Sequence, residues 1–489
     1  GGKDVETQLA AFCSAVSAGE LPVTQGLDSI GAAAYYRAGL VQSGAVRLAA
    51  RGVRRWPDGT ILPHTLGFTG PVTAEQWPAA RAQGLAMDAT IGQNGLEAAY
   101  DTLLRGRDGQ LQINVGLDGV TRETMQTSTP VPGCTLVLTL DADLQKTLQT
   151  ALQNQMDTLR TTKGIGAGRE VRAGAAVVVD VRTGGILAAA SLPDFDLSRY
   201  RSDYAALFAD SAAPLLDRVC QGLYAPGSAF KPAVAAAALT AGIDPAATVN
   251  CTGKYFYYSN YHPGCLQYGH RGPVDLRTAL EYSCNIFFYD TGRRLGVDTF
   301  SAMARQLGLA NDTGVEITAA QGRLTWSTDT NYQDGLTLMA AIGQGNTAVT
   351  PLQLAQYAAT LANYGRKPTL HFADRAVQPA TGAAVWQYEP AFTEIPGGEA
   401  VFGPIRDGMK RMAQTARALR EAPVTVAAKT GSPQLADTLP NGSHYVNSVL
   451  IGYAPADDPQ IAMAVVLEYG GGGANAAPVM RAVLDAWFE

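Results

Sequence analysis

The chain has 489 residues, of which 46% are hydrophobic, so it is long enough to form two or three domains with a large core. Its formal net charge is −6 and the sequence has no dense run of Lys and Arg, which argues against nucleic acid as a partner. No apolar run reaches the roughly 18–20 residues that a membrane-spanning helix needs, and no signal peptide is visible.

Residues 1–130 are predicted to form a smaller N-terminal domain. Apolar residues recur in it at helical spacing, and Thr73 followed by Gln76 is typical of a helix N-terminus. The predicted elements are helices over 8–18, 30–48, 73–86 and 95–104 and a strand over 109–116. No group of residues suited to catalysis occurs here, so we expect a non-catalytic pedestal that ends near the Pro- and Gly-containing segment 128–133.

Residues 131–489 are predicted to form a larger domain. Its predicted strands lie over 135–140, 174–180, 185–190, 424–429, 447–453 and 461–468. Its predicted helices lie over 141–160, 233–239, 274–295, 333–364 with a break at 343–350, 401–420 and 476–488. Strands at both ends with helices between them predict an α/β fold of the α+β type, with a largely antiparallel sheet flanked by helices.

The stretch 224–232 combines a turn with a possible nucleophile. Its Pro-Gly pair favours a turn, and the apolar run 233–239 behind it indicates a buried helix, so Ser228 should stand near a helix N-terminus. Lys231 follows three residues later, which puts both side chains on one helical face. A serine hydroxyl needs a base, and a lysine shielded from water can serve as one. The alternative is a helix cap followed by a surface lysine.

Two further short motifs follow in order along the chain. Ser283 and Asn285 form an S-x-N motif, and residues 429–432 read K-T-G-S. Together with the S-x-x-K of Ser228 and Lys231, they form the site of penicillin-recognising serine enzymes. At this point the chain resembles the class B penicillin-binding protein transpeptidases. Taken singly, Ser283 and Asn285 could be polar residues in the middle of a helix that bond locally. Lys429 could be a charge on an edge strand that blocks aggregation.

The resemblance spans most of the chain and implies a transpeptidase domain over 131–489 behind a dimerisation-type pedestal over 1–130. The matching segments are 95–106, 138–145, 190–196, 343–353 and 452–455. The glycosyltransferase domain of the bifunctional class A relatives is not found, so class B is the better match. The chain departs from the family pattern at three places. Ser432 stands where threonine is commoner, Asp217 stands where asparagine is usual, and the pair at 449–450 is less aromatic than the usual pair.

The resemblance also implies a role for each catalytic residue. Ser228 would attack the carbonyl between two D-alanines of a stem peptide, and Lys231, kept neutral by Lys429, would take the hydroxyl proton. Ser283 would relay that proton to the departing amine. Asn285 would orient the substrate amide and hydrogen-bond the lysine. The implied activity is a serine-type peptidoglycan D,D-transpeptidase that works through an acyl-serine and is inhibited by β-lactams.

The K-T-G-S run is implied to bind the substrate. Lys429 and Thr430 would hold the terminal carboxylate, and Gly431 would let the substrate lie along the strand edge. The backbone N–H groups of Ser228 and Ser432 would form the oxyanion hole, where the loss of one donor typically costs about 10²–10³ in rate.

Other functions remain open at this stage. A β-lactamase or a D,D-carboxypeptidase would use the same acylation, and a non-catalytic β-lactam sensor would share the fold. Class A β-lactamases carry a glutamate four residues before an asparagine, between the second and third motifs. None of the glutamates in that interval has an asparagine at this spacing: Glu316, Glu389, Glu394, Glu399 and Glu421.

The cysteines predict no metal site and one pair of nearby thiols. The six cysteines form no C-x-x-C, and the five histidines form no H-E-x-x-H, so neither a metal nor another cofactor is expected. Cys251 and Cys265 share one Tyr-rich loop, which predicts a disulfide or a close thiol pair, with two separate thiols as the alternative. Cys284 lies inside the S-x-N motif and is expected to be packed rather than bonded.

The resemblance further implies the partners and the location. Expected partners are peptidoglycan stem peptides as donor and amine acceptor, β-lactam antibiotics, and a glycosyltransferase in a wall-synthesis complex. The expected location is the extracytoplasmic face of the bacterial membrane, held by an N-terminal anchor that this sequence does not include.

Overall fold

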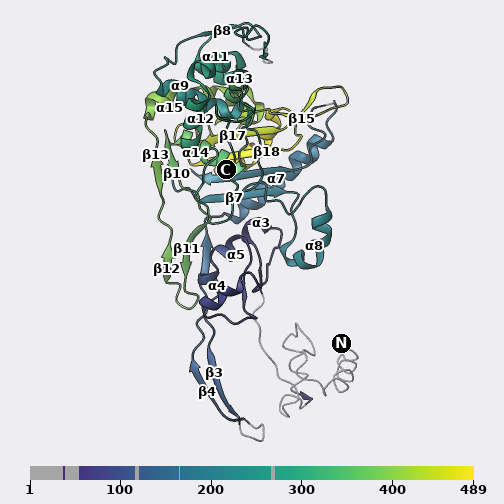
Figure 1. Cartoon of the computed structure of the whole chain (residues 1–489), viewed down its shortest axis with the longest axis vertical. Helices are drawn as coiled ribbons and strands as arrows, with labels where there is room; N and C mark the ends of the chain where they lie inside the picture. Colours follow the sequence, from purple (N-terminus) through teal and green to yellow (C-terminus); the bar gives the residue numbers. More distant parts are fainter. Residues whose placement is uncertain (1–36, 39–53, 116–120, 165, 266–269) are drawn as a thin grey trace. The chain divides into compact units, whose positions relative to one another are not determined.

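The computed structural model describes residues 37–38, 54–115, 121–164, 166–265 and 270–489 (Figure 1). The chain divides into two compact units, Gly1–Arg55 and Trp56–Glu489, and nearly all of the described residues belong to the second. Apart from residues 37 and 38, the helices predicted over 8–18 and 30–48 lie outside the described residues. Because Trp56–Glu489 form one unit, the boundary expected between residues 130 and 131 stays a prediction.

A five-stranded antiparallel sheet forms the centre of the larger unit. In spatial order its strands are β14 (Ala427–Gly431), β17 (Ser448–Ala454), β18 (Ile461–Leu467), β6 (Gly174–Asp180) and β7 (Ile186–Leu192). Every residue of β7, β17 and β18 is buried, so these strands are continuous apolar runs rather than alternating ones. The predicted α+β fold with a largely antiparallel sheet is confirmed.

Helices cover both faces of this sheet. On one face, α7 (Ala142–Arg160) and α17 (Ala477–Phe488) pack through a core that includes Leu148 and Leu152. The predicted start of α7 is confirmed, because the Asp141 carboxylate accepts hydrogen bonds from the second and third helical N–H groups. On the other face, α9 (Lys231–Thr240) and α14 (Pro351–Ala362) lie in a larger core.

The predicted helix over 274–295 is interrupted, and this correction matters for the site. The structure has α10 (Leu276–Glu281), a break at residues 282–284, and α11 (Asn285–Leu295). Ser283 lies in the break with φ 55°, a left-handed conformation that ends the first helix. Apolar spacing continues through both helices, so periodicity does not reveal the break.

The N-terminal part of this unit is built from short elements. Gly95–Ala99 (α5) and Asp101–Leu104 (α6) replace the single helix predicted there, and Gln110–Val115 (β3) confirms the predicted strand. The helix predicted over 73–86 is shorter, Trp77–Ala82 (α4). Its expected reciprocal pair forms in the turn before it, where Thr73 N donates to Gln76 Oε1 (3.0 Å) and Gln76 N to Thr73 Oγ1 (3.4 Å).

Further helices and strands surround the central sheet and its flanking helices. The other helices are α3 (Pro63–Leu66), α8 (Tyr200–Ala209), α12 (Val297–Gln306), α13 (Asp334–Ala341), α15 (Gly398–Thr415) and α16 (Arg417–Arg420). The other strands are β1 (Thr69–Pro71), β2 (Thr90–Gly92), β4 (Thr121–Ser128), β5 (Thr135–Leu138), β8 (Val249–Cys251), β9 (Gly272–Val274), β10 (Arg366–Pro368), β11 (Ala373–Val377), β12 (Ala384–Gln387), β13 (Phe392–Glu394), β15 (Gln434–Thr438) and β16 (His444–Val446). None of the helices within the described ranges is both long and apolar enough to cross a membrane.

Candidate active site

Ser228 lies in a short 3₁₀ turn, Gly227–Phe230, that leads directly into α9. Gly227 has φ 55°, and its N–H donates to the carbonyl of Gly343 (2.9 Å). A Cβ on Gly343 would come within 2.2 Å of the Gly227 carbonyl oxygen, so only glycine allows this close approach. The other residues of the turn are buried and Ser228 is half-buried, so its side chain is the accessible part of a fixed turn.

Lys231, the first residue of α9, is fully buried. Its Nζ donates to the Ser283 carbonyl (2.7 Å), to Ser283 Oγ (3.1 Å) and to Asn285 Oδ1 (2.7 Å). Burial lowers its pKa to about 7, and the nearby thiols of Cys284 and Cys265 act in the opposite direction. A substantial fraction of this lysine is therefore neutral near pH 7, as a general base requires.

The cause of this low pKa differs from the one expected from the sequence. We expected Lys429 to keep Lys231 neutral, but burial is the dominant cause. Lys429 is fully buried as well, and burial together with the charge of Lys231 lowers its pKa. Two ammonium groups near one hydroxyl repel each other. We therefore infer that only one of the two lysines is positively charged near neutral pH.

Ser283 lies between the two lysines. Its Oγ accepts one hydrogen bond from Lys231 Nζ and one from Lys429 Nζ, each 3.1 Å long. A hydroxyl oxygen that accepts both of these bonds still has its own proton to donate to a further partner. Ser283 and Asn285 therefore do not bond locally within a helix, which excludes the mid-helix alternative.

Asn285 begins α11, and both ends of its side-chain amide are engaged. Oδ1 accepts from Lys231, which is the contact expected from the sequence, and Nδ2 donates to the carbonyl of Gly264 (3.2 Å). No hydrogen bond joins Ser228 to Lys231 in the described part of the chain, and such contacts often tighten only when substrate binds.

The edge strand β14 brings the K-T-G-S run to the turn Gly227–Phe230, called the nucleophile turn here because it carries Ser228, the candidate nucleophile. A Cβ on Gly431 would lie 2.2 Å from the Pro226 carbonyl oxygen, and one on Gly227 would lie 3.2 Å from the Ser432 nitrogen. The absence of a side chain at Gly431 is thus needed for the close approach of this strand to the turn. This role adds to the one expected from the sequence, which was to leave room for substrate. The Ser432 hydroxyl accepts a hydrogen bond from the N–H of Gly473 (2.8 Å). Serine keeps the hydroxyl of the threonine that is commoner at this position, and this hydroxyl makes the bond.

Thr430 is oriented differently from its two neighbours. Its Oγ1 contacts Met412 Sδ of α15 at 3.8 Å, whereas Lys429 donates to Ser283 Oγ and Gly431 lies against the turn that carries Ser228. Side chains alternate along a strand, which explains the difference. The role of Thr430 in binding a carboxylate stays a prediction.

The charged pair before the nucleophile stabilises the surrounding loop. Asp217, one of the three departures from the expected family pattern, accepts from the N–H groups of Val219 (3.0 Å) and Cys220 (3.1 Å). Arg218 Nε donates to Glu468 (2.9 Å), which also accepts from the Tyr224 hydroxyl (2.8 Å). These bonds link the loop to the residue that follows β18.

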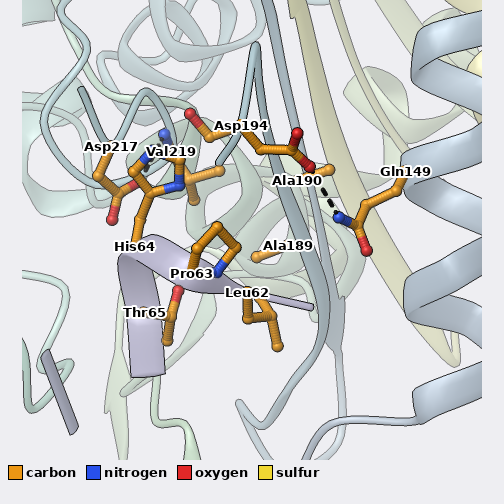
Figure 2. Close-up of a pocket in the computed structure, with 11 residues that line it drawn as sticks. Leu62, Pro63, His64, Thr65, Gln149, Ala189, Ala190, Asp194, Asp217 and Val219 are labelled. Atoms are coloured by element: carbon orange, nitrogen blue, oxygen red, sulfur yellow. Dashed lines mark hydrogen bonds between the residues drawn. The ribbon is translucent and has the colours of Figure 1, made fainter. Parts of the chain in front are cut away.

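A small cavity lies beside α3 and β7, and Asp217 and Val219 are among the residues that line it (Figure 2). Gln149 Nε2 donates to Asp194 Oδ2 (3.2 Å) on one side, and His64 lines it on the other. Burial raises the pKa of Asp194. At about 10 Å³ the cavity has room for about one water, so it is not a substrate site.

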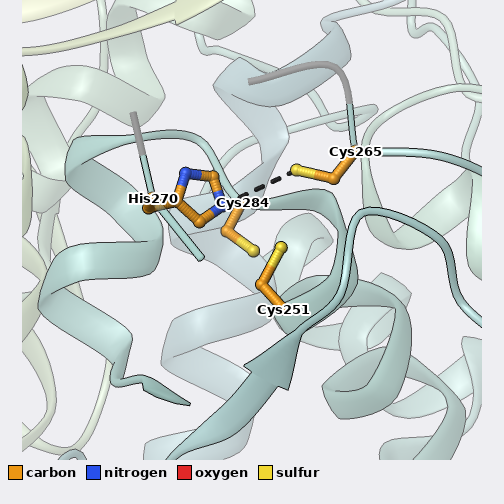
Figure 3. A group of neighbouring side chains, drawn as sticks. All are labelled: Cys251, Cys265, His270 and Cys284. Atoms are coloured by element: carbon orange, nitrogen blue, oxygen red, sulfur yellow. Dashed lines mark hydrogen bonds between the residues drawn. The ribbon is translucent and has the colours of Figure 1, made fainter. Parts of the chain in front are cut away.

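Four potential metal ligands meet beside the S-x-N motif, which sequence reasoning missed. Cys251, Cys265, His270 and Cys284 are all buried, and their ligand atoms lie within 4.8 Å of one another (Figure 3). The sequence predicted no metal site because it has no C-x-x-C motif. That argument fails here, since these four residues come from separate segments and need no such motif to meet. The available signal was that all four residues fall within one segment of the chain, 251–284.

The two cysteine predictions can be compared with this arrangement. Cys251 and Cys265 are close, as predicted, but carry thiols that are not joined in a disulfide. Cys284 is buried and is not joined to another cysteine by a disulfide, as expected.

Comparisons with known proteins match most of the chain. The family model of the penicillin-binding protein transpeptidase domain matches residues 174–485, and that of the penicillin-binding protein dimerisation domain matches residues 30–138. A curated relative, the peptidoglycan D,D-transpeptidase MrdA of Acinetobacter baumannii, is 30% identical over 469 residues, which is 90% of this chain and 67% of that protein.

Solved structures show the same likeness. A chain from a peptidoglycan synthase complex, whose structure is described as coordinating polymerization and crosslinking, is 30% identical with a TM-score of 0.77, over 93% of this chain and 80% of that one. Pseudomonas aeruginosa PBP2 in complex with WCK 5153 is 29% identical with a TM-score of 0.71, over 90% of this chain and 92% of that one.

Proposed function

Because the chain belongs to the penicillin-binding protein transpeptidase family, as the three motifs indicated, we propose that Ser228 is the nucleophile of its peptidoglycan D,D-transpeptidase activity. The single observation that carries this assignment is the environment of Lys231. A buried lysine with a pKa of about 7, three residues after Ser228 and hydrogen-bonded to Ser283 and Asn285, is suited to act as a base.

Acylation would proceed in two proton transfers. Ser228 Oγ attacks the carbonyl between the last two D-alanines of a stem peptide while Lys231 takes its proton. The tetrahedral intermediate collapses with cleavage of the peptide bond, and the proton passes through Ser283 to the departing D-alanine amine. The result is an ester on Ser228 and neutral lysine, ready for the next step.

The substrate would be held by β14. Lys429 provides a positive charge for the terminal carboxylate, with the Thr430 hydroxyl as a further donor after rotation away from Met412. The N–H groups of Ser228 and Ser432 would stabilise the oxyanion, and the approach of β14 to the nucleophile turn supports this pairing.

The acyl group would then pass to an amine of a neighbouring stem peptide rather than to water. Lys231 deprotonates the incoming amine, and the new amide forms as the ester bond to Ser228 breaks. Between the S-x-N and K-T-G motifs no glutamate lies four residues before an asparagine, so water is left without the base that class A β-lactamases have there. This supports cross-linking over the β-lactamase alternative.

The partner and the location follow from the substrate. Peptidoglycan lies outside the cytoplasmic membrane, so we place the activity on its extracytoplasmic face. The structure of a similar chain within a peptidoglycan synthase complex supports a glycosyltransferase as the partner that makes the glycan strands.

An assay with a D-Ala-D-Ala peptide donor and an added amine acceptor tests this function. We expect release of one D-alanine for each new donor–acceptor amide, and neither product with Ser228→Ala. The matched control Ser202→Ala, on exposed α8, should behave as the wild type. Hydrolysis of the donor without formation of the amide would indicate a carboxypeptidase. If the donor reacts neither with the added amine nor with water, that result would argue against catalysis.

A further inference from the structure

A cleft larger than the cavity beside α3 lies along the loop that joins α12 to α13. Its volume is about 630 Å³, which falls within the range of about 300–1,000 Å³ that is usual for ligand sites. Mostly polar residues line it. They are Arg305 from the last turn of α12, most of residues 322–331 from the loop, and Asn346 from the segment between α13 and α14. The proposed acyl transfer uses none of these side chains.

Two arginines give the cleft an excess of positive charge. Arg305 and Arg323 are exposed, and neither forms an ion pair with any residue that the structure describes. The one acid in the lining is Asp329, whose Oδ2 accepts from Trp326 N (3.1 Å) and from Asn346 Nδ2 (2.7 Å). The acid is thus bonded within the loop. Two guanidinium groups without an acidic partner suit a carboxylate or a phosphate, which can accept two parallel N–H bonds from one arginine.

Contacts within the protein hold both arginines in place. The Arg305 guanidinium lies over the Trp326 ring, 5.0 Å from its centroid. Arg323 Nε donates to the carbonyl of Asn346 (2.9 Å), and the backbone of Arg323 exchanges hydrogen bonds of 2.8 and 2.9 Å with Ala348. The terminal nitrogens of Arg323 keep their N–H groups for a ligand. Donors that are fixed before binding lose less conformational entropy when the ligand arrives.

The segment 343–349 connects this cleft to the nucleophile turn. At its start, the Gly343 carbonyl accepts from the N–H of Gly227, the residue before Ser228 (2.9 Å). Three residues later, Asn346 lines the cleft. Three residues of chain span at most about 11 Å, so the cleft begins within that distance of the glycine. A peptide of four residues can span about 14 Å, which is enough to reach from the nucleophile into the cleft.

We propose that this cleft binds the C-terminal carboxylate of the acceptor stem peptide, an inference that rests on the proposed function. The acceptor must present its amine to the ester on Ser228, and Lys429 is already assigned to the carboxylate of the donor. A second peptide therefore needs a cationic site of its own beside the nucleophile, and Arg305 and Arg323 provide one. A phosphate would fit the same donors but has no part in the proposed reaction.

Binding is measured by calorimetry on the Ser228→Ala protein, so that the result does not depend on turnover. The probe is a synthetic stem peptide that ends in a single D-alanine and therefore cannot act as a donor. It is compared with the same peptide as its C-terminal amide. We expect the free acid to bind about tenfold more tightly, with a smaller advantage at high salt because the arginines are exposed. Equal affinities for the two peptides would overturn the proposal.

Matched variants in the same background locate the site. Arg305→Gln and Arg323→Gln should each weaken binding of the free acid to about the affinity of the amide, and leave the amide unchanged. The control Arg417→Gln removes another exposed arginine, on α16, and should bind like its parent. A preference for the free acid that survives in both cleft variants, or that is lost equally in the control, would contradict the assignment.

A competition experiment separates a carboxylate site from a phosphate site. Inorganic phosphate and acetate are added at the same ionic strength to the complex of the Ser228→Ala protein with the free-acid peptide. We expect the two anions to displace the peptide to a similar, small extent. Displacement by phosphate alone would identify a phosphate site and overturn the proposed occupant.

The role in cross-linking is measured with active protein. Arg305→Gln and Arg323→Gln should raise the KM for the free-acid acceptor about tenfold, while kcat and the acylation of Ser228 by benzylpenicillin stay unchanged. An unchanged KM would refute the acceptor role. If the wild type itself is not acylated, the proposed function is refuted instead, and the calorimetric comparison still decides whether the cleft binds a carboxylate.

Discussion

At the scale of single residues, the site is defined by two buried lysines that share the hydroxyl of Ser283. Burial makes it costly for both to be charged, and the hydrogen bonds of Lys231 to Ser283 and Asn285 fix its amine. This gives the proposed base a neutral form near physiological pH without a histidine. The rate of acylation should therefore depend on pH.

The first prediction concerns this pH dependence. The titratable groups that face Lys231 are Lys429 from β14 and the thiols of Cys265 and Cys284. Because only the neutral amine accepts the Ser228 proton, the acylation rate should rise about tenfold per pH unit up to the pKa of about 7 and level off above it. Stopped-flow acylation by a chromogenic β-lactam measures it. A rate that falls as the pH increases through 7 would contradict the role of Lys231.

The second prediction tests Thr430, which the structure leaves beside Met412. If its hydroxyl rotates to bind the substrate carboxylate, Thr430→Val should lower the acylation efficiency by about 10–100-fold, because a hydrogen bond to a charged group contributes about 1.5–3 kcal/mol. Thr430→Ser keeps the hydroxyl and should remain close to the wild type. Unchanged acylation in the valine variant would show that Lys429 binds the carboxylate without this residue.

At the scale of elements, the approach of β14 to the nucleophile turn determines the geometry. The strand can lie there because Gly431 has no side chain, and the turn is held on its other side by Gly343. The oxyanion hole that we propose consists of one N–H group from each of these two elements. Their separation should therefore control the rate.

The third prediction follows from that contact. Gly431→Ala would place a Cβ 2.2 Å from the Pro226 carbonyl oxygen and push the strand from the turn. We expect the acylation rate to fall by about 100-fold or more while the protein remains folded. The control Gly472→Ala, where a Cβ meets nothing within 4 Å, should have no effect. Equal rates for both variants, measured with unchanged circular dichroism, would show that the β14 contact is not needed.

The elements also show what the sequence could and could not predict. The sheet strands and α7 were predictable because their apolar runs and the Asp141 cap are local signals. The break at Ser283 was not, since it depends on the contacts of its hydroxyl with two lysines distant in sequence. The group around Cys284 was missed for the same reason: its members come together only through the β8–β9 pairing.

The candidate site shows the same division. The order of the three motifs predicted which residues matter, and the Lys231–Asn285 hydrogen bond was expected from the family resemblance. Spacing within one helical turn supported only the proximity of Ser228 and Lys231. The dominant role of burial in the pKa of Lys231 and the orientation of Thr430 required the packed structure.

At the scale of the whole molecule, the site lies between the central sheet and the helical region that contains α9 and α11 (Figure 1). β14 comes from the sheet, and the nucleophile turn and the S-x-N motif come from the helical region. Catalysis therefore depends on bringing together short segments that lie up to about 200 residues apart in the sequence. With penicillin, the bulky remnant of the drug would stay where the leaving group departs and would block an incoming amine.

The fourth prediction concerns this acyl-enzyme. Without a base to activate water, the penicilloyl-enzyme should persist for minutes to hours, since a missing general base costs on the order of 10²–10⁴ in rate. Time-resolved intact mass after removal of excess benzylpenicillin measures the decay. A rapid return to the unmodified mass with multiple turnovers would indicate a β-lactamase on the same fold.

The most direct test of the central claim is to find the residue that carries the acyl group. After incubation with benzylpenicillin, intact mass spectrometry should show one penicilloyl adduct per chain, and peptide mapping should place it on Ser228. The Ser228→Ala variant should fold normally and remain unmodified. An adduct on another residue, or modification of the Ser228→Ala variant to the wild-type level, would contradict the account.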